Sequence, residues 1–136
     1  MTDQGSIEEL DEAACWARLG SRRVGRLAVS VNNRPDIFPV NYVLDDRTVV
    51  VQTAPGFKLA AAVLGAGVAF EVDDIDEATH SGWSVVLHGS ASEVTSVEDL
   101  LEAEDLHVGP WAGGEKNHFI RIQVDEITGR RIPPSA

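Results

Sequence analysis

The feature that most constrains the fold of this chain is a succession of short apolar, β-branched runs separated by tight turns. Residues 27–31, 37–44 and 48–53 form three such runs, and turn-forming residues at 32–36 and 45–46 separate them. Because strands joined by so few residues pair as antiparallel hairpins, this region predicts an antiparallel sheet.

Three later runs extend the predicted sheet: residues 68–72, 84–94 and 119–127, with Gly89 as a bulge or bend in the second. Six short antiparallel strands favour a mainly β protein that closes into a small barrel, because closure removes the exposed edges of a sheet. An α+β sandwich is the alternative. The 136 residues fit one domain, 1–136, with flexible ends at 1–6 and 133–136.

Helical signals occupy three short segments between these runs. Residues 7–19 place apolar side chains at helical spacing with acidic residues first, residues 57–64 are rich in alanine, and a capping pattern opens residues 96–106. We therefore expect three short helices beside the barrel.

Charge and cysteine content exclude several classes of function. The chain carries 11 basic and 22 acidic residues, a net charge of −11, which disfavours binding to nucleic acids or anionic membranes. No apolar run approaches the length of a membrane span, and the acidic start does not resemble a signal peptide. A single cysteine, Cys15, forms no intrachain disulfide and fits a reducing cytoplasm, so we expect a cytoplasmic protein.

Residues 53–58 are a candidate anion site. A strand ends at Thr53, a Pro-Gly turn follows, and a helix is expected to begin near Lys58. The first turn of a helix offers free N–H groups and a positive dipole end, to which Thr53 adds a hydroxyl and Lys58 a cation. This pattern predicts a phosphate site, although a plain helix cap with a solvent-facing lysine has the same sequence.

Polar residues interrupt the apolar run at 37–44. Asn41 and Tyr42 face opposite sides of a strand, so one of them points inward. An inward asparagine needs hydrogen-bond partners, which a bound ring with amide-like edges could supply. An edge position facing water is the alternative.

Two tryptophans are further candidates for ligand contact. Trp83 begins a long strand and either stacks on a ligand or packs in the core or a dimer interface. Trp111 lies in a loop rich in glycine, where an aromatic side chain often covers a ligand or a partner subunit.

Other polar groups carry weaker signals. His80, His88, His107 and His118 have no metal-ligand spacing, so no metal is predicted. The acidic run at 71–77 is interpreted as a solvated loop face. Arg130 and Arg131 either pair with surface acids or complete an anion site across a dimer.

Six segments, taken in order, resemble the pyridoxamine 5′-phosphate oxidase-like family of flavin-binding split β-barrels, which includes nitroimidazole-resistance-type flavoproteins. They are Val24-Gly25-Arg26-Leu27, Phe38-Pro39-Val40-Asn41-Tyr42, Thr53 to Leu59, Phe70-Glu71-Val72-Asp73, Gly82-Trp83-Ser84-Val85 with Gly89, and Thr128-Gly129-Arg130-Arg131. Together they span nearly the whole domain, and their order is more specific for the fold than for the reaction.

The resemblance implies a homodimer with flavin mononucleotide (FMN) sites at the subunit interface. It places Thr53 and Lys58 at the flavin phosphate, the strand Val40-Asn41-Tyr42 beside the isoalloxazine ring, and Trp83-Ser84 near the cofactor, often from the second subunit. Gln52 and Trp111 complete the set of candidate cofactor contacts.

The chain also departs from the family pattern. Gln52 and Phe57 stand where many members carry basic residues, and each lost charge-assisted contact is worth about 1.5–3 kcal/mol of phosphate binding. The resemblance implies a flavin-dependent oxidoreductase that acts on a small molecule through the chemistry of the cofactor, with no general acid or base identified. A non-enzymatic protein that binds flavin or deazaflavin as a carrier is the alternative.

Overall fold

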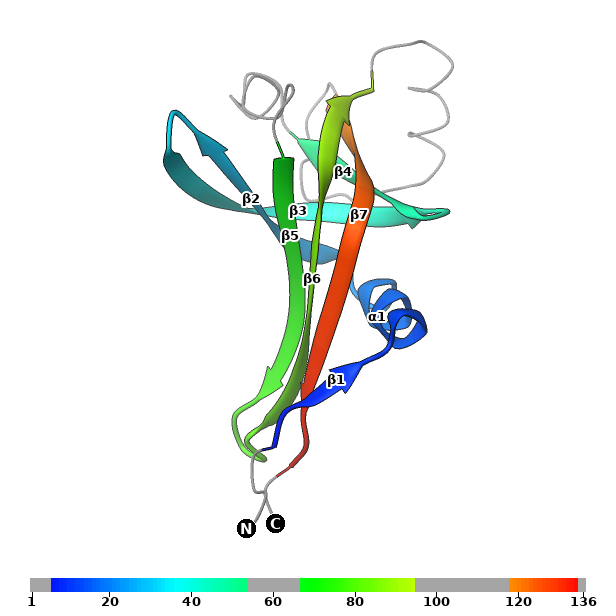
Figure 1. Cartoon of the computed structure of the whole chain (residues 1–136), viewed down its shortest axis with the longest axis vertical. Helices are drawn as coiled ribbons and strands as arrows, with labels where there is room; N and C mark the ends of the chain where they lie inside the picture. Colours follow the sequence, from blue (N-terminus) through cyan, green and yellow to red (C-terminus); the bar gives the residue numbers. More distant parts are fainter. Residues whose placement is uncertain (1–5, 54–66, 95–117, 135–136) are drawn as a thin grey trace.

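The computed structural model describes residues 6–53, 67–94 and 118–134 of the chain (Figure 1). In these ranges one helix accompanies seven strands: β1 (Glu8–Leu10), α1 (Glu12–Leu19), β2 (Val24–Val31), β3 (Arg34–Asp45), β4 (Thr48–Thr53), β5 (Gly67–Asp76), β6 (Ser81–Glu93) and β7 (His118–Ile132).

The strands form one antiparallel sheet that closes on itself. Neighbouring strands follow the order β1-β7-β4-β3-β2-β5-β6, and an additional pairing of β6 with β7 joins the two sides into a ring. Figure 1 shows β5, β6 and β7 running side by side, with α1 beside β7. The prediction of a mainly β barrel built from six antiparallel strands is confirmed, and every predicted strand is present.

The N-terminal segment differs from the prediction of a helix over residues 7–19. Glu8–Leu10 forms β1, which pairs with the β7 segment that contains Gly129, and the helix begins only at Glu12. Asp11 caps the helix by accepting a hydrogen bond from the Ala14 N–H at 2.8 Å. Strand pairing satisfies backbone groups that would otherwise form another helical turn, so β1 replaces the first turn.

The turn between β2 and β3 is tighter than the sequence suggested. Asn32 and Asn33 both have positive φ angles, 53° and 64°, and form a two-residue turn of the kind that matches strand twist. Strand β3 therefore starts at Arg34, and the turn predicted over 32–36 is wrong in its second half. Pro35 is tolerated there because this end of β3 pairs with β2 alone among the described strands.

Inward-facing side chains of the strands, together with Leu19 of α1, fill the barrel. The largest fully buried members are Tyr42, Phe70, Leu19, Leu27, Leu87, Ile120 and Ile122. Phe70 packs against the backbone at Gly25, where a Cβ would lie 2.4 Å from the ring atom Cζ, so this position requires glycine. The ring of Tyr42 meets that of Phe70 edge-on, with centroids 5.0 Å apart.

Two details of β5 and β6 bear on the sequence predictions. The register of β6 with β7 shifts between His88 and Gly89, which confirms the bulge predicted at Gly89. The acidic run starting at Glu71 belongs to strand β5 up to Asp76, so its interpretation as a loop is wrong for those residues. The alternation of β5 places only part of the run in full solvent.

Some predictions fall on segments outside the described residues. The helices expected over 57–64 and 96–106, Lys58 and Trp111 all lie there. Among the described residues, no helix is long and apolar enough to cross a membrane.

Candidate functional site

The outer face of β2 and β3 carries the candidate site. Along β2 the side chains alternate, with Gly25 and Leu27 buried and Val24 and Arg26 exposed. In an antiparallel pair, residues directly opposite each other share a face, so Asn41 lies beside Val24 and Pro39 beside Arg26. These four side chains form a block on the outside of the barrel.

A cavity of about 320 Å³ opens at this block. It is lined by Val24, Pro39, Val40 and Asn41. Three of these residues are apolar, and Asn41 supplies the carboxamide. Val24 is 46% exposed, which is high for a valine, so the cavity offers an apolar surface to a ligand. The predicted residues Val40 and Asn41 are thus brought together.

A pair of side-chain amides lies at this position of the sheet. Asn41 and Gln52 are directly opposite each other in β3 and β4, and they are only 7% and 9% exposed. Within the described part of the chain, the Asn41 side chain forms no hydrogen bond. The Asn41 side chain is nearly buried but keeps a small contact with solvent, so its donors and acceptor are accessible to a ligand with complementary groups.

Tyr42 and Trp83 lie on the inner side of the barrel. Tyr42 is 1% exposed, and its hydroxyl donates a hydrogen bond to the backbone carbonyl of Leu19. Burial raises its pKa well above that of free tyrosine. Trp83 is 8% exposed, and the guanidinium carbons of Arg18 and Arg22 lie 5.4 and 5.7 Å from its ring centroid. Both aromatic side chains support the barrel from inside.

The remaining predicted contacts are spread over the molecule. Ser84 faces outward on β6, opposite Asp73, and β2 and β5 separate it from Asn41 within one chain. Thr53 is the last residue of β4 and follows Gln52 directly in the chain. Residues 54–58, part of the predicted phosphate site, come next in the sequence. A direct contact of Ser84 with a ligand in this cavity would therefore have to come from a second subunit.

Arg26, directly opposite the lining residue Pro39, belongs to a cluster of three charged side chains. We call Arg26, Glu71 and Asp73 the Arg26 cluster. One guanidinium nitrogen, Nη1 of Arg26, lies 3.2 Å from Oε1 of Glu71 and 3.4 Å from Oδ2 of Asp73. Desolvation and the neighbouring Asp73 carboxylate raise the pKa of Glu71 to about 7, against the smaller opposing effect of Arg26.

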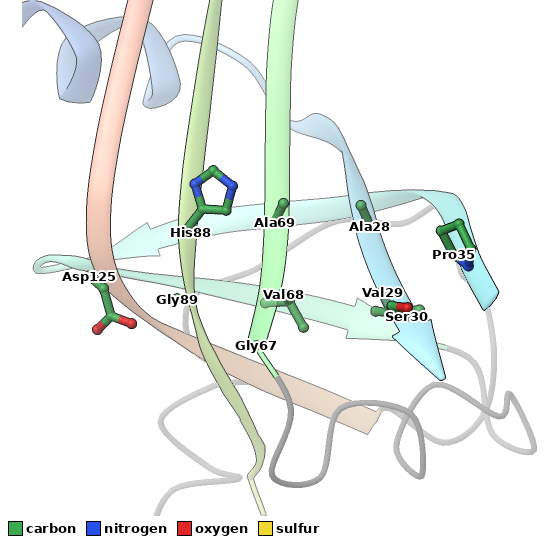
Figure 2. Close-up of a pocket in the computed structure, with 10 residues that line it drawn as sticks. All are labelled: Ala28, Val29, Ser30, Pro35, Gly67, Val68, Ala69, His88, Gly89 and Asp125. Atoms are coloured by element: carbon green, nitrogen blue, oxygen red, sulfur yellow. The ribbon is translucent and has the colours of Figure 1, made fainter. Parts of the chain in front are cut away.

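A second hollow lies farther along the same outer face. Its volume is about 430 Å³, and Figure 2 shows the methyl groups of Ala28 and Ala69 between Pro35 and His88. It is lined by Ala28, Val29, Ser30, Pro35, Gly67, Val68, Ala69, His88, Gly89 and Asp125. Ile37, directly opposite Ala28, is 68% exposed. The small side chains of Ala28 and Ala69 leave a hollow beside the exposed Ile37, and this combination suits contact with the surface of another protein subunit.

The two C-terminal arginines have different surroundings. Arg131 forms an ion pair with Glu8 of β1 at 2.8 Å, as one of the two sequence interpretations expected. Arg130 is exposed on the outer face, opposite Ser84, and forms no ion pair with another described residue. Arg130 thus remains available to an anion from outside the subunit.

Sequence reasoning missed Val24, Pro39 and the Arg26 cluster as parts of this region. Pro39 and Val24 were visible only as members of family motifs, because their exposure follows from strand register. A sharper signal was present in β5, where Glu71 and Asp73 are two residues apart and so share one face of a strand. Their common partner Arg26, 45 residues away from Glu71, is defined only by the pairing of β2 with β5.

The closed sheet and its outward cavity define a split β-barrel of the flavoprotein type. The sequence profile of the pyridoxamine 5′-phosphate oxidase family matches residues 11–131, so the chain belongs to this family. The uncharacterized protein Rv0080 of Mycobacterium tuberculosis is 33% identical over 93% of this chain and 86% of its own length.

Solved structures agree with this assignment. An FAD-binding protein from Mycobacterium smegmatis is 39% identical, covers 93% of this chain and 100% of its own, and superposes with a TM-score of 0.79. A candidate 5-nitroimidazole antibiotic resistance protein from Bacteroides thetaiotaomicron shares the fold with a TM-score of 0.74. It is 12% identical and covers 93% of this chain and 89% of its own.

Proposed function

We propose that this protein is a flavin-dependent oxidoreductase that binds FMN and acts on a small molecule. The observation that carries the proposal is the buried Asn41 carboxamide, which lines an apolar cavity without a partner among the described residues. The similarity to an FAD-binding protein from M. smegmatis supports a flavin as the ligand.

Different residues of the chain would contact different parts of the flavin. Asn41 and Gln52 are neutral, so they suit the ring edge of a flavin rather than its phosphate. Val24 and Pro39 offer apolar contacts to the ring, whereas Val40 lines the cavity but packs against the core, and Tyr42 fixes strand β3 from inside the barrel. The phosphate would lie beyond Thr53, toward Lys58. The bound flavin supplies hydride and electron transfer, while the protein binds and orients it.

We further propose that the active form is a homodimer in the cytoplasm. The hollow around Ala28 and Ala69 and the exposed Ile37 support a second subunit on the outer face. In such a dimer, Ser84, Trp111 and Arg130 of the partner would complete the site around the flavin phosphate or the substrate. The single cysteine supports a reducing compartment.

A carrier of flavin or deazaflavin is the second candidate function. It is favoured by the lining of the cavity, because Val24, Pro39, Val40 and Asn41 include no titratable side chain. Reduction of the bound flavin by a nicotinamide donor, followed by reoxidation with a small acceptor, would support the oxidoreductase. A bound flavin that no donor reduces would support the carrier.

The experiment that tests the phosphate assignment compares FMN with riboflavin on the wild-type protein and on Lys58→Ala. Loss of a charge-assisted contact should weaken FMN binding about tenfold or more, while riboflavin binding stays unchanged. Fluorescence quenching measures both affinities. Equal FMN affinity in the two proteins would refute the role of Lys58, and titrations with FAD and a deazaflavin would identify the preferred cofactor.

A further inference from the structure

We propose that filling the cavity beside Asn41 is coupled to the uptake of a proton by the Arg26 cluster, so that flavin affinity rises as the pH falls through neutrality. This inference rests on the flavin site proposed above and adds a regulation of that site. The group that takes up the proton is the Glu71 carboxyl, which shares Nη1 of Arg26 with Asp73.

Geometry places the cluster at the edge of the cavity. Arg26 lies directly opposite Pro39, which lines the cavity, and it follows Val24 by two residues on the same face of β2. Glu71 lies directly opposite Arg26 on the next strand, β5. A ring seated against Val24 and Pro39 would therefore remove water from the side chains of the cluster.

The net charge of the Arg26 cluster links the loss of water on ligand binding to the binding of a proton. Two carboxylates share one nitrogen of a single guanidinium, which leaves one excess negative charge when both are ionised. The side chains of Glu71 and Asp73 are already only 30% and 27% exposed. Further loss of water disfavours the uncompensated charge, and the cluster responds by binding a proton. The raised pKa of Glu71, about 7, allows this near neutral pH.

No other described group on the surrounding strands neutralises this charge. The β6 residue directly opposite Glu71 is Val86, which is uncharged. Ser84 and His88 flank Val86 on the same face of β6. Nδ1 of His88 lies 3.6 Å from Oε1 of Glu126 on β7. Thr128 and Arg130 of β7 face the same side but lie beyond β6. Pro39, Ile37 and Asn41 of β3 are uncharged, and Arg22, before β2, is paired with Asp74.

Riboflavin is the suitable probe, because it lacks the phosphate whose own second pKa, about 6, would confound the titration. We expect the dissociation constant of riboflavin to rise about fivefold or more between pH 6 and pH 8 in the wild-type protein. In Glu71→Gln, which mimics the protonated carboxyl, the constant should stay near the value of the wild type at pH 6. Glu8→Gln is the matched control, since Glu8 also pairs with an arginine but lies on β1.

Several outcomes would overturn the coupling. They are a wild-type affinity independent of pH, a pH dependence that persists in Glu71→Gln, and loss of the dependence in His88→Asn. A carboxyl titration of the ligand-free protein by carbon NMR gives an independent readout, with a Glu71 midpoint near 7 expected and a midpoint below about 5 contradicting it. Absence of both riboflavin and FMN binding at every pH would refute the proposed function and the coupling with it, whereas absence of riboflavin binding alone, or pH-independent binding, refutes only the coupling.

Discussion

Replacing Asn41 by leucine should make the ligand-free protein more stable and the flavin complex weaker. The carboxamide is 7% exposed and forms no hydrogen bond within the described residues. Full burial of an unpaired amide costs about 1–3 kcal/mol, and leucine of similar volume removes the part of this cost that Asn41, which keeps some contact with solvent, carries. With allowance for imperfect packing of the new side chain, the free energy of unfolding should rise by about 1 kcal/mol.

Urea denaturation without flavin measures the first effect. With a slope of about 1–3 kcal/mol per molar urea, the midpoint should move up by about 0.3–1 M while the slope stays constant. Riboflavin affinity should fall about tenfold, the equivalent of about 1.4 kcal/mol, because the ring edge loses its partner. Gln123→Leu, an exposed amide on β7, is the control and should change neither quantity. A variant that is less stable but binds riboflavin normally would show that Asn41 is structural and would refute the reasoning.

Three further predictions concern the barrel around the site. Because the folded-state pKa of Glu71 is raised to about 7 from 4.5, the stability of the wild type should fall as the pH rises between these values. Glu71→Gln should therefore be more stable by about 1 kcal/mol at pH 8, a value reduced for partial exposure, and equal at pH 5 in urea titrations. Gly25→Ala should lower the free energy of unfolding by about 1–3 kcal/mol, because the new methyl group would overlap the Phe70 ring. Thermal denaturation measures this change, and unchanged stability would contradict the packing of Phe70 against Gly25. Tyr42→Phe should cost about 1–3 kcal/mol by leaving the Leu19 carbonyl without its donor, and a neutral effect in urea titrations would argue against that hydrogen bond.

The sequence predicted the barrel because its strands carry local signals. The β-branched runs at 37–44 and 48–53 and the short turns between them define an antiparallel hairpin without help from the rest of the chain. The segment Glu8–Leu10 has no such signal, since two glutamates and a leucine become a strand only by pairing with β7. The helix start was misplaced for the same reason, although Asp11 is a residue type that often caps helices.

The candidate site was only partly predictable. Asn41 attracted attention because a polar residue in an apolar strand needs a partner, and the structure places it in a cavity. The Arg26 cluster was not foreseen, because its arginine and its carboxylates meet through the register of β2 with β5 rather than through spacing along the chain. The role of Trp83 in direct ligand contact stays a prediction, and its place in the core supports the interpretation as a core residue.

The measurement that tests the central claim most directly is the visible absorbance of the purified protein, before and after addition of FMN and dialysis. The account predicts a retained flavin spectrum from the wild type and a clearly lower flavin content in Asn41→Leu at equal protein concentration. A wild-type protein that retains no flavin, FMN or FAD, after dialysis, and shows no quenching of riboflavin fluorescence, would contradict it.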